Sequence, residues 1–498
     1  MTHSLNLLAF DIGASNGRGI LARFDGQRMT MAPVHQFDNH YAQEGDLCTW
    51  DAPGILKGIK EAFRRAKGQG ITPDSFGIDT WGVDYGLLDP EGRLLEPPRA
   101  YRMSTEADMA AVFSRIPGRR LFDITGIAAN VFDTVFQLHR RVREGDPALK
   151  NAAALLFMPD LLAHALTGEV TCEYTIASVS GLLDIHTRQF SQEILTALGI
   201  PPRLFTHLSM PGQLKGALSP DIAKELGLPR IPLALVGSHD TASAVAAIPG
   251  SGDFAFCSSG TWSCFGFESR QPLLGDAAFA SGFGNEGSVQ GGFRPLKNIM
   301  GLWLVQECRR EWARETGRLM DWEHIKQAAE SAPPLRSIID TDHPAFYQAG
   351  DMPAKIRDYC KKTGQPLPET VGEIARTCYE SLALKYRYTL DAMGKMKGTQ
   401  VTSLNIVGGG TKNRLLNQMA ADATGLAVIT GPVEGAAMGN ALVQAMAHGE
   451  ITGMDQLRDV VRASVETQVY TPRPSHAWED AYGRLLTNMN TIKEDIPS

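Results

Sequence analysis

The first 26 residues constrain the fold most, because they form a strand, a tight turn of small residues and a second strand-like segment. Residues 5–11 are a buried-strand run that ends in the carboxylate of Asp11. The run Gly-Ala-Ser-Asn-Gly at 13–17 follows, and residues 19–24 stop at Asp25-Gly26, a pair typical of hairpin turns. We therefore expect this turn to join a strand to a strand.

A turn of this composition could bind a nucleotide in two ways. A dinucleotide turn needs a helix directly after it, because the pyrophosphate rests on the N-terminus of that helix. A short-chain dehydrogenase also needs a tyrosine four residues before a lysine, and none of the eleven tyrosines has one. A phosphate hairpin explains more: small residues admit phosphate oxygens, Asp11 can hold Mg²⁺ directly or through waters, and Arg18 can bind a phosphate bidentately.

Two further glycine turns lie later in the chain. Residues 254–267 repeat the strand, polar turn and strand layout, with the turn at Ser258-Ser259-Gly260-Thr261. A strand at 401–407 runs into Gly408-Gly409-Gly410, and a helix is expected to open there, which would expose backbone N–H groups to an anion. Strand and helix patterns alternate up to residue 240, so the fold class is α/β.

Length and charge set outer limits on the function. The 498 residues exceed the roughly 250–300 at which one core stops growing, so two domains are expected. The 48 basic and 55 acidic residues form no long block of either sign, which disfavours a nucleic-acid partner. No apolar run approaches a membrane span, and the N-terminus does not resemble a signal peptide. Seven scattered cysteines without a C-x-x-C pattern favour a cytoplasmic protein with reduced thiols.

A candidate catalytic carboxylate follows the strand at 233–236. His239 and Asp240 stand at the end of that strand, ahead of a helix that begins with small residues. In α/β domains, ligand sites lie at the carboxyl ends of the strands. Phosphoryl transfer needs a carboxylate that accepts the proton of the attacking hydroxyl. The alternative is that Asp240 only caps the helix, a common role for aspartate in this position.

Seven blocks of the sequence, in order, resemble those of rhamnulokinases, a group within the FGGY carbohydrate kinases. The blocks are FDIGASNGRG, GIDTWGVDYGLLD, GSHDTASAV, SSGTWS, KNIMGLWLVQE, IVGGGTKNRLLNQMAADATG and GPVEGAAMGNAL. The resemblance spans roughly residues 7 to 445. It implies an actin-like, ribonuclease-H-like fold with ATP in an interdomain cleft. The expected domains are 1–245 on the sugar side and 246–498 on the ATP side.

The resemblance also implies roles for individual residues. Asp240 resembles the general base, and Asp11 resembles the carboxylate associated with Mg²⁺. The positions similar to those that contact ATP are Ala14, Ser15, Asn16, Gly17, Arg18, Thr261, Gln306 and Gly409. The positions similar to those that contact the ketose are Gly82, His239, Asp240, Thr241 and Asn298.

Other polar and aromatic residues near these blocks have two interpretations each. Trp81 could stack on a sugar or belong to the core. Gln306 is polar on an apparent helix and could be a surface residue. Glu434 could contact nucleotide, but a helix cap is the favoured interpretation.

Three positions depart from the rhamnulokinase pattern. Met103 follows Tyr101-Arg102 where the group commonly has aspartate, Asp133 stands where it often has asparagine, and Asn16 stands where it often has serine. The first two are on the sugar side. Because a site built to pair a hydroxyl discriminates strongly, these departures leave the identity of the sugar open.

The resulting prediction is an ATP- and Mg²⁺-dependent kinase for a primary hydroxyl of a ketose, with O1 of L-rhamnulose as the first choice. The alternatives are a kinase for another ketose such as L-fuculose, and a non-catalytic actin-fold sugar sensor. A dehydrogenase ranks third. The sequence gives no prediction of the oligomeric state.

Overall fold

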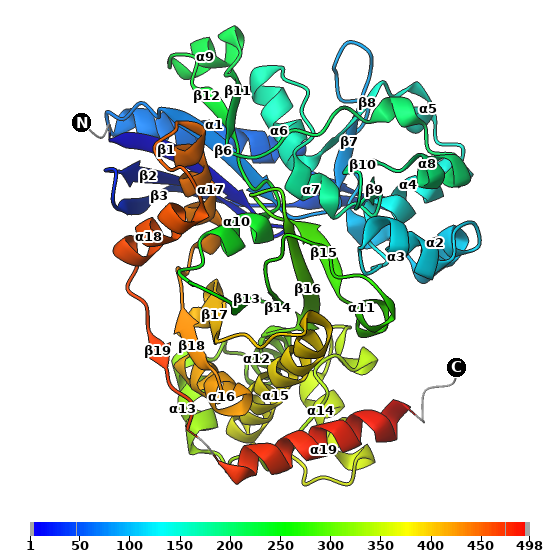
Figure 1. Cartoon of the computed structure of the whole chain (residues 1–498), viewed down its shortest axis with the longest axis vertical. Coiled ribbons are helices and arrows are strands. Elements are labelled where there is room, and N and C mark those ends of the chain that lie inside the picture. The colour runs from blue at the N-terminus through cyan, green and yellow to red at the C-terminus, as the bar shows by residue number, and fades with distance from the viewer. Residues whose placement is uncertain (1–3, 46, 474, 494–498) are drawn as a thin grey trace. The chain divides into compact units, whose positions relative to one another are not determined.

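The computed structural model describes residues 4–45, 47–473 and 475–493 (Figure 1). The chain divides into two compact units. Unit 1 contains the residues up to 249 together with 268–296 and 434–465. Unit 2 contains 250–267, 297–433 and the residues from 466 onward.

Unit 1 is built around a six-stranded sheet. In spatial order its strands are β11 (Gln213–Ala217), β12 (Pro232–Leu235), β6 (Ser75–Thr80), β1 (Leu5–Ile12), β2 (Asn16–Phe24) and β3 (Met29–Asp38). Strand β1 pairs antiparallel with β2 and parallel with β6. The antiparallel β1–β2 pair confirms that the first glycine turn joins two strands, and it removes the helix that a dinucleotide turn requires.

Both faces of this sheet are buried, because successive apolar side chains of β1 point to opposite faces of the sheet. Leu8, Phe10 and Ile12 belong to one hydrophobic core and Leu7 and Ala9 to another. Helix α1 (Ala52–Gly68) packs on β2 and β3. Helix α17 (Gly435–Ala447) packs on β1 and β6, and helix α10 (Asp240–Ala246) packs on α17. Figure 1 shows the orange α17 beside these blue strands from the other end of the chain.

The remaining elements of unit 1 are short. Its other strands are β4 (Tyr41–Glu44), β5 (Leu47–Trp50), β7 (Tyr85–Leu88), β8 (Ala154–Phe157), β9 (Leu183–Asp184), β10 (Gln189–Phe190) and β15 (Gly284–Gly287). Its other helices are α2 (Glu106–Phe113), α3 (Gly118–Thr125), α4 (Thr134–Arg143), α5 (Pro147–Asn151), α6 (Met158–Thr167), α7 (Tyr174–Ser178), α8 (Gln192–Leu198), α9 (Pro220–Leu226), α11 (Asp276–Ser281) and α18 (Met454–Ser464), with 3₁₀ turns η1 (Tyr101–Met103) and η2 (Pro202–Leu204).

Unit 2 contains the second hairpin, β13 (Phe254–Ser259) with β14 (Trp262–Gly266). Strand β13 pairs parallel with β17 (Ser403–Val407), β17 pairs parallel with β18 (Ala427–Thr430), and β18 pairs antiparallel with β19 (Val469–Tyr470). On the other side of β14 lies β16 (Phe293–Met300), whose first residues belong to unit 1. This sequence of pairings repeats that of β1, β2, β6, β12 and β11 in unit 1, as the repeated hairpin layout suggests.

The helices of unit 2 are α12 (Trp303–Thr316), α13 (Trp322–Ser331), α14 (Met352–Lys362), α15 (Val371–Lys397), α16 (Arg414–Thr424) and α19 (His476–Lys493), with 3₁₀ turns η3 (Pro344–Phe346) and η4 (Gly409–Lys412). The glycine turn at 408–410 enters η4 before α16 begins, and the Asn413 side chain caps α16 by accepting from the Leu416 N–H at 3.1 Å. No helix in the described part of the chain has the length and apolar character needed to cross a bilayer.

Candidate active site

Ala14 to Arg18 lie at the tip of the β1–β2 hairpin. Hydrogen bonds accepted by the backbone carbonyl groups of this turn fix its conformation. The Gly13 N–H donates to the Asn16 carbonyl at 2.9 Å, which closes the turn. Asn39, just after β3, donates its backbone N–H to the Ser15 carbonyl and its side-chain amide to the Gly13 carbonyl, both at 3.0 Å. A Cβ on Gly17 would lie 2.4 Å from the Phe37 ring, so only glycine fits there. The turn is therefore a fixed loop of small residues.

Carboxylates gather below this turn. Asp11 on β1 lies in register with Asp79 on β6, and with Arg18 on β2. Burial raises the pKa of Asp11 to about 6; Arg18 opposes that shift, and the negative charges of Asp240 and Glu434 add to it. Burial likewise raises the pKa of Asp79, whose Oδ2 accepts from the Asn440 amide at 2.7 Å. Burial and like charge therefore both disfavour the ionised forms of these carboxylates.

Glu434 has a partner that the sequence did not indicate. Glu434 precedes α17, but its side chain makes no hydrogen bond to the helix amides and instead forms an ion pair with Arg18. The cap interpretation of Glu434 is therefore wrong, because an arginine on the adjacent strand β2 competes for its carboxylate. Among the described residues, no three His, Cys, Asp or Glu side chains are arranged to hold a metal ion.

Asp240 begins α10, and its carboxylate is held by one oxygen. His239 occupies the N-cap position, so Asp240 is the first residue of the helix and not its cap. Its Oδ1 accepts from the Thr241 N–H at 2.5 Å and the Thr241 hydroxyl at 3.1 Å. Oδ2 has no hydrogen-bond partner within the described residues, and the side chain is 33% exposed. The carboxylate is thus fixed in orientation while one oxygen remains open to a ligand.

The sequence-predicted sugar residues of unit 1 lie around this carboxylate. His239 Nε2 is 3.5 Å from Asp240 Oδ1. A Cβ on Gly82 would lie 3.4 Å from the same His239 nitrogen, so the absence of a side chain there leaves the imidazole edge uncovered. The Thr80 N–H donates to the Ser238 carbonyl at 2.9 Å, which ties the end of β6 to the turn that carries His239. Gly82, His239, Asp240 and Thr241 therefore lie close together.

The turn that follows Gly82 is strained and held from several sides. Val83 has a φ of 72°, a left-handed conformation that is rare for a β-branched residue. Its carbonyl accepts from the Thr134 hydroxyl at 2.7 Å and from the Gln137 amide at 3.3 Å. Asp84 is buried and accepts from the indole N–H groups of Trp50 and Trp81 at 2.6 and 3.0 Å. This network fixes the backbone at Gly82.

Trp81 is therefore a core residue in this structure. Its ring packs against Trp50 with centroids 4.4 Å apart, and only 7% of the residue is exposed. The sugar-stacking interpretation finds no support in this geometry.

His239 is also held from its other side, by two residues that the sequence did not single out. Glu286 on β15 lies 3.3 Å from His239 Nδ1, and Arg294 on β16 donates to the same Glu286 oxygen at 3.0 Å. The antiparallel pairing of β15 and β16 places Glu286 opposite Arg294. Although burial alone would raise it, His239 and Arg294 together hold the pKa of Glu286 below its ordinary value.

In unit 2, three of the sequence-predicted ATP residues lie near the tip of the second hairpin. The Thr261 hydroxyl donates to Gln306 Oε1 at 3.0 Å, which links the hairpin to the first turn of α12. Gly408 has a φ of 85°, and a Cβ on it would lie 3.0 Å from the Ser259 carbonyl, so the turn that carries Gly409 packs closely on the end of β13. Asn298, a sequence-predicted sugar residue, is exposed on β16 and accepts from the Cys264 thiol at 3.2 Å.

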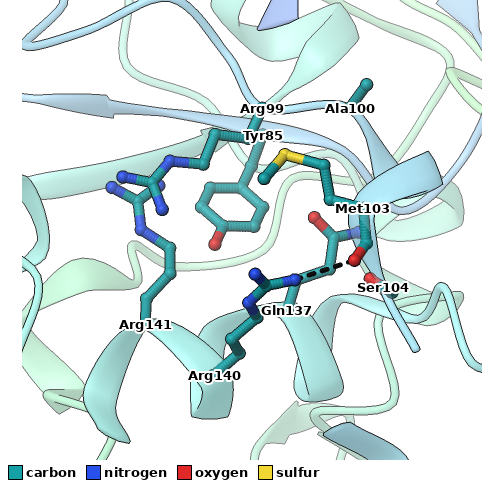
Figure 2. A pocket seen from close by; sticks show the side chains of 8 residues that line it. All are labelled: Tyr85, Arg99, Ala100, Met103, Ser104, Gln137, Arg140 and Arg141. Atoms are coloured by element: carbon teal, nitrogen blue, oxygen red, sulfur yellow. Dashed lines mark hydrogen bonds between the residues drawn. The ribbon is translucent and has the colours of Figure 1, made fainter. Parts of the chain in front are cut away.

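Met103 and Asp133, the two departures on the sugar side, both belong to unit 1. Met103 lines a cavity of about 30 Å³ together with Tyr85, Gln137 and Arg140 (Figure 2). Arg140 donates to the Met103 carbonyl at 2.7 Å, the bond drawn in the figure. Asp133 is buried, and burial raises its pKa; its carboxylate accepts from the Asn130 N–H at 2.9 Å. Both residues thus shape the loops that flank Gln137.

Residues 6–247 match the N-terminal domain of the FGGY family of carbohydrate kinases, and residues 255–448 match the C-terminal domain. This chain belongs to the FGGY family of carbohydrate kinases. The two matched domains account for most of the chain, so the dehydrogenase interpretation is wrong, and phosphate binding by the first hairpin stays a prediction.

Within this family the chain is similar to proteins named rhamnulokinase. One from Bacteroides thetaiotaomicron is 40% identical over 479 residues, which cover 96% of this chain and 98% of the relative. One from Enterococcus faecalis is 38% identical and covers 94% of each chain. The crystal structure of xylulose kinase from Rhodospirillum rubrum matches with a TM-score of 0.80 over 99% of both chains at 17% identity, which shows a shared FGGY kinase fold.

Proposed function

We propose that this FGGY kinase transfers the γ-phosphoryl group of ATP to a primary hydroxyl of a ketose, and that the ketose is L-rhamnulose, phosphorylated at O1. The observation that carries the chemistry is the Asp240 carboxylate, held through Oδ1 with Oδ2 open and placed beside His239 and Gly82. The rhamnulokinase relatives, similar along nearly the whole chain, support the choice of sugar.

In the proposed reaction, Asp240 Oδ2 accepts the proton of the attacking hydroxyl. The hydroxyl oxygen forms a bond to the γ-phosphorus while the bond from that phosphorus to the β–γ bridging oxygen breaks, and ADP leaves. A positioned base of this kind contributes about 10²–10⁴-fold to the rate. The two bonds from Thr241 keep Oδ1 occupied and so direct the second oxygen toward the substrate.

The carboxylate cluster fits a magnesium ion. Asp11 and Asp79 lie in register on adjacent strands, and the buried Asp79 Oδ1 has no hydrogen-bond partner within the described residues. Mg²⁺ is commonly held by one or two carboxylates together with phosphate oxygens, and Asp11 would hold it here, directly or through water. When bound with ATP, Mg²⁺ would neutralise part of the phosphate charge.

The remaining site residues keep the roles that the family resemblance gives them. For ATP these are Ala14, Ser15, Asn16, Gly17, Arg18, Thr261, Gln306 and Gly409, and for the ketose Gly82, His239, Thr241 and Asn298. Without ATP, the ion pair with Arg18 balances the charge of Glu434. When ATP is bound, the Arg18 guanidinium contacts a phosphate group. Residues 1–245 as the sugar-binding domain and 246–498 as the ATP-binding domain complete the proposal. The seven cysteines, all free thiols, support a cytoplasmic location.

A second candidate is a kinase for another ketose, such as L-fuculose. Met103 and Asp133 favour this second candidate, because both depart from the rhamnulokinase pattern. Both also lie beside Gln137, whose side chain supports the turn at Gly82–Asp84. A changed loop on this side could alter which hydroxyl pattern the site accepts.

The product decides between the proposal and its alternatives. Incubation with ATP, Mg²⁺ and L-rhamnulose, followed by ³¹P and ¹H NMR, should show a phosphate ester on C1 together with ADP. Asp240→Asn should lower kcat by about 10²–10⁴-fold and leave the Kd for ATP unchanged. An Asp240→Asn enzyme with wild-type kcat would exclude Asp240 as the base.

A further inference from the structure

A short helix, α7, lies against the turn that leads into Asp240. Its N-cap residue is Glu173, whose buried carboxylate accepts through Oε2 from the N–H groups of Thr175 and Ile176 at 2.9 and 3.1 Å. The same oxygen also accepts from the Thr175 hydroxyl at 2.6 Å and from the Ser238 N–H at 3.2 Å. Glu173 therefore caps its own helix and at the same time holds the start of the turn before α10.

The Thr175 hydroxyl reaches one residue further along that turn. Its oxygen accepts from the His239 N–H at 3.2 Å, while its hydrogen is donated to Glu173 Oε2. A hydroxyl carries one hydrogen and two lone pairs, so it can donate and accept at once. Thr175 is fully buried, so bulk water does not reach either bond. The peptide nitrogens of Ser238 and His239 are thus both tied to α7, directly before Asp240.

The same helix contacts two other segments that lie next to His239. The Ser178 hydroxyl accepts from the Gly287 N–H on β15 at 2.7 Å. Val179 follows the helix, and a Cβ on Gly82 would lie 3.0 Å from its side chain. A buried helix of five residues therefore touches all three segments.

We infer that Thr175 is a positioning residue for phosphoryl transfer, and that its hydroxyl fixes the His239 peptide so that Asp240 Oδ2 faces the attacking hydroxyl of the ketose. The inference rests on the proposed function for the role of Asp240 as the base. Thr241 sets the rotation of the Asp240 carboxylate through Oδ1, whereas Thr175 sets the position of the backbone that carries it.

Glu173 orients the Thr175 hydroxyl for this task. Because Oε2 takes the hydrogen of that hydroxyl, a lone pair of its oxygen is left for the His239 N–H. Burial raises the pKa of Glu173 to about 8. The other oxygen, Oε1, shares only the Thr175 N–H, and Oε2 can accept its four bonds whether or not Oε1 carries a proton. The arrangement therefore holds on both sides of that pKa.

The variant Thr175→Val removes the hydroxyl and keeps the shape of the side chain. The His239 N–H then has no acceptor among the described residues, which frees the turn to move. Because a displacement of about 1 Å in a reacting group can cost about 100-fold, we expect kcat to fall about 10–100-fold with the ketose that the wild type prefers, and KM for ATP to stay unchanged. Thr175→Ala should behave in the same way, and Thr175→Ser, which keeps the hydroxyl, should recover most of the lost kcat.

The matched control is Thr167→Val. Thr167 is also a buried threonine of unit 1, and it ends α6. Its hydroxyl likewise makes two bonds, because it donates to the Ala163 carbonyl at 2.8 Å and accepts from the Glu169 N–H at 3.0 Å. These bonds stay within the end of α6 and the residues after it, so Thr167→Val should keep the wild-type kcat.

Amide hydrogen–deuterium exchange reads the turn without catalysis. In the protein without substrates, the His239 amide, followed in a peptide that spans residues 237–241, should exchange faster in Thr175→Val than in the wild type. In Thr175→Ser and Thr167→Val it should exchange at the wild-type rate. Unchanged exchange at His239 in Thr175→Val, or a Thr175→Val enzyme with wild-type kcat, would overturn the inference. If the wild type phosphorylates no ketose, the proposed function fails, whereas the exchange rates still decide whether Thr175 fixes the turn.

Discussion

Asp84 gives a stability prediction whose size follows from the structure. Its carboxylate is fully buried below the Gly82 turn and accepts from Trp50, Trp81 and Gln137 at 2.6, 3.0 and 3.2 Å. Burial outweighs these bonds and raises its pKa from 3.8 to about 6. The change to test is Asp84→Asn, which removes the ionisable group and keeps the shape of the side chain.

The sign follows from proton binding. Between pH 4 and 6 the folded state binds the Asp84 proton more tightly than the unfolded chain does. Asp84 therefore stabilises the fold most below pH 4, and that contribution is lost as the pH rises through about 6. The pKa difference corresponds to about 3 kcal/mol in total, of which about 1 kcal/mol falls between pH 5 and pH 7. Asp84→Asn does not titrate, so its stability should lack this component.

The assay is urea unfolding of both proteins at pH 5 and pH 7, followed by near-ultraviolet circular dichroism. The Trp50–Trp81 pair, whose rings are tilted by 46° with centroids 4.4 Å apart, contributes to that signal. The free energy of unfolding of wild type minus that of Asp84→Asn should fall by about 1 kcal/mol from pH 5 to pH 7. A difference that does not change with pH would refute the reasoning, because the hydrogen bonds would then have offset the cost of burial.

Asp25→Asn is a control of opposite sign. The carboxylate of Asp25 is exposed, and backbone N–H donors from Arg28 and Gln27 lower its pKa. Its stabilising effect is present at neutral pH and is lost as the pH falls. The wild-type minus variant difference should therefore rise with pH.

Two further pairs of substitutions, each a test and its control, probe the packing and the ATP side of the site. Gly439→Ala places a Cβ 1.8 Å from the Ser243 carbonyl, where α17 crosses α10, and should lower the free energy of unfolding by about 3 kcal/mol or prevent folding. Gly483→Ala in α19 is the control, because a Cβ there meets no atom within 4 Å, and it should raise the free energy of unfolding by up to about 1 kcal/mol. Equal thermal melting temperatures for the two variants would contradict the packing at Gly439. Arg18→Gln should raise KM for ATP about tenfold without changing KM for the sugar, whereas Arg23→Gln, exposed on the same strand, should change neither; equal effects would argue against a phosphate contact.

The parts of the fold that the sequence predicts are those set by local chemistry. The small residues at 13–17 and the Asp25-Gly26 pair indicate a hairpin without knowledge of the rest of the chain, and β1–β2 confirms it. Asp240 is also indicated locally, because a polar pair ends a strand ahead of a helix. The structure removes the cap interpretation by showing His239, and not Asp240, at the N-cap, and the role of Asp240 as base stays a prediction.

The parts that the sequence misses depend on contacts between distant segments. Glu434 was expected to cap α17, but its carboxylate pairs with Arg18, 416 positions earlier in the chain. Asp79 belongs to a recognisable block, yet its proximity to Asp11 depends on the parallel register of β1 and β6. Glu286 and Arg294 carry no local signal, since a short polar hairpin occurs in many proteins. Only the fold shows that they hold His239.

The most direct test of the central claim is ADP release from ATP and Mg²⁺ with a panel of L-rhamnulose, L-fuculose, L-ribulose and D-xylulose. The proposed function predicts the highest kcat/KM for L-rhamnulose, with Met103 and Asp133 as neutral variations. A clear preference for another ketose would keep the mechanism and place the change in specificity at those two residues. Tight ATP binding without turnover of any sugar would contradict the claim and favour a sugar sensor.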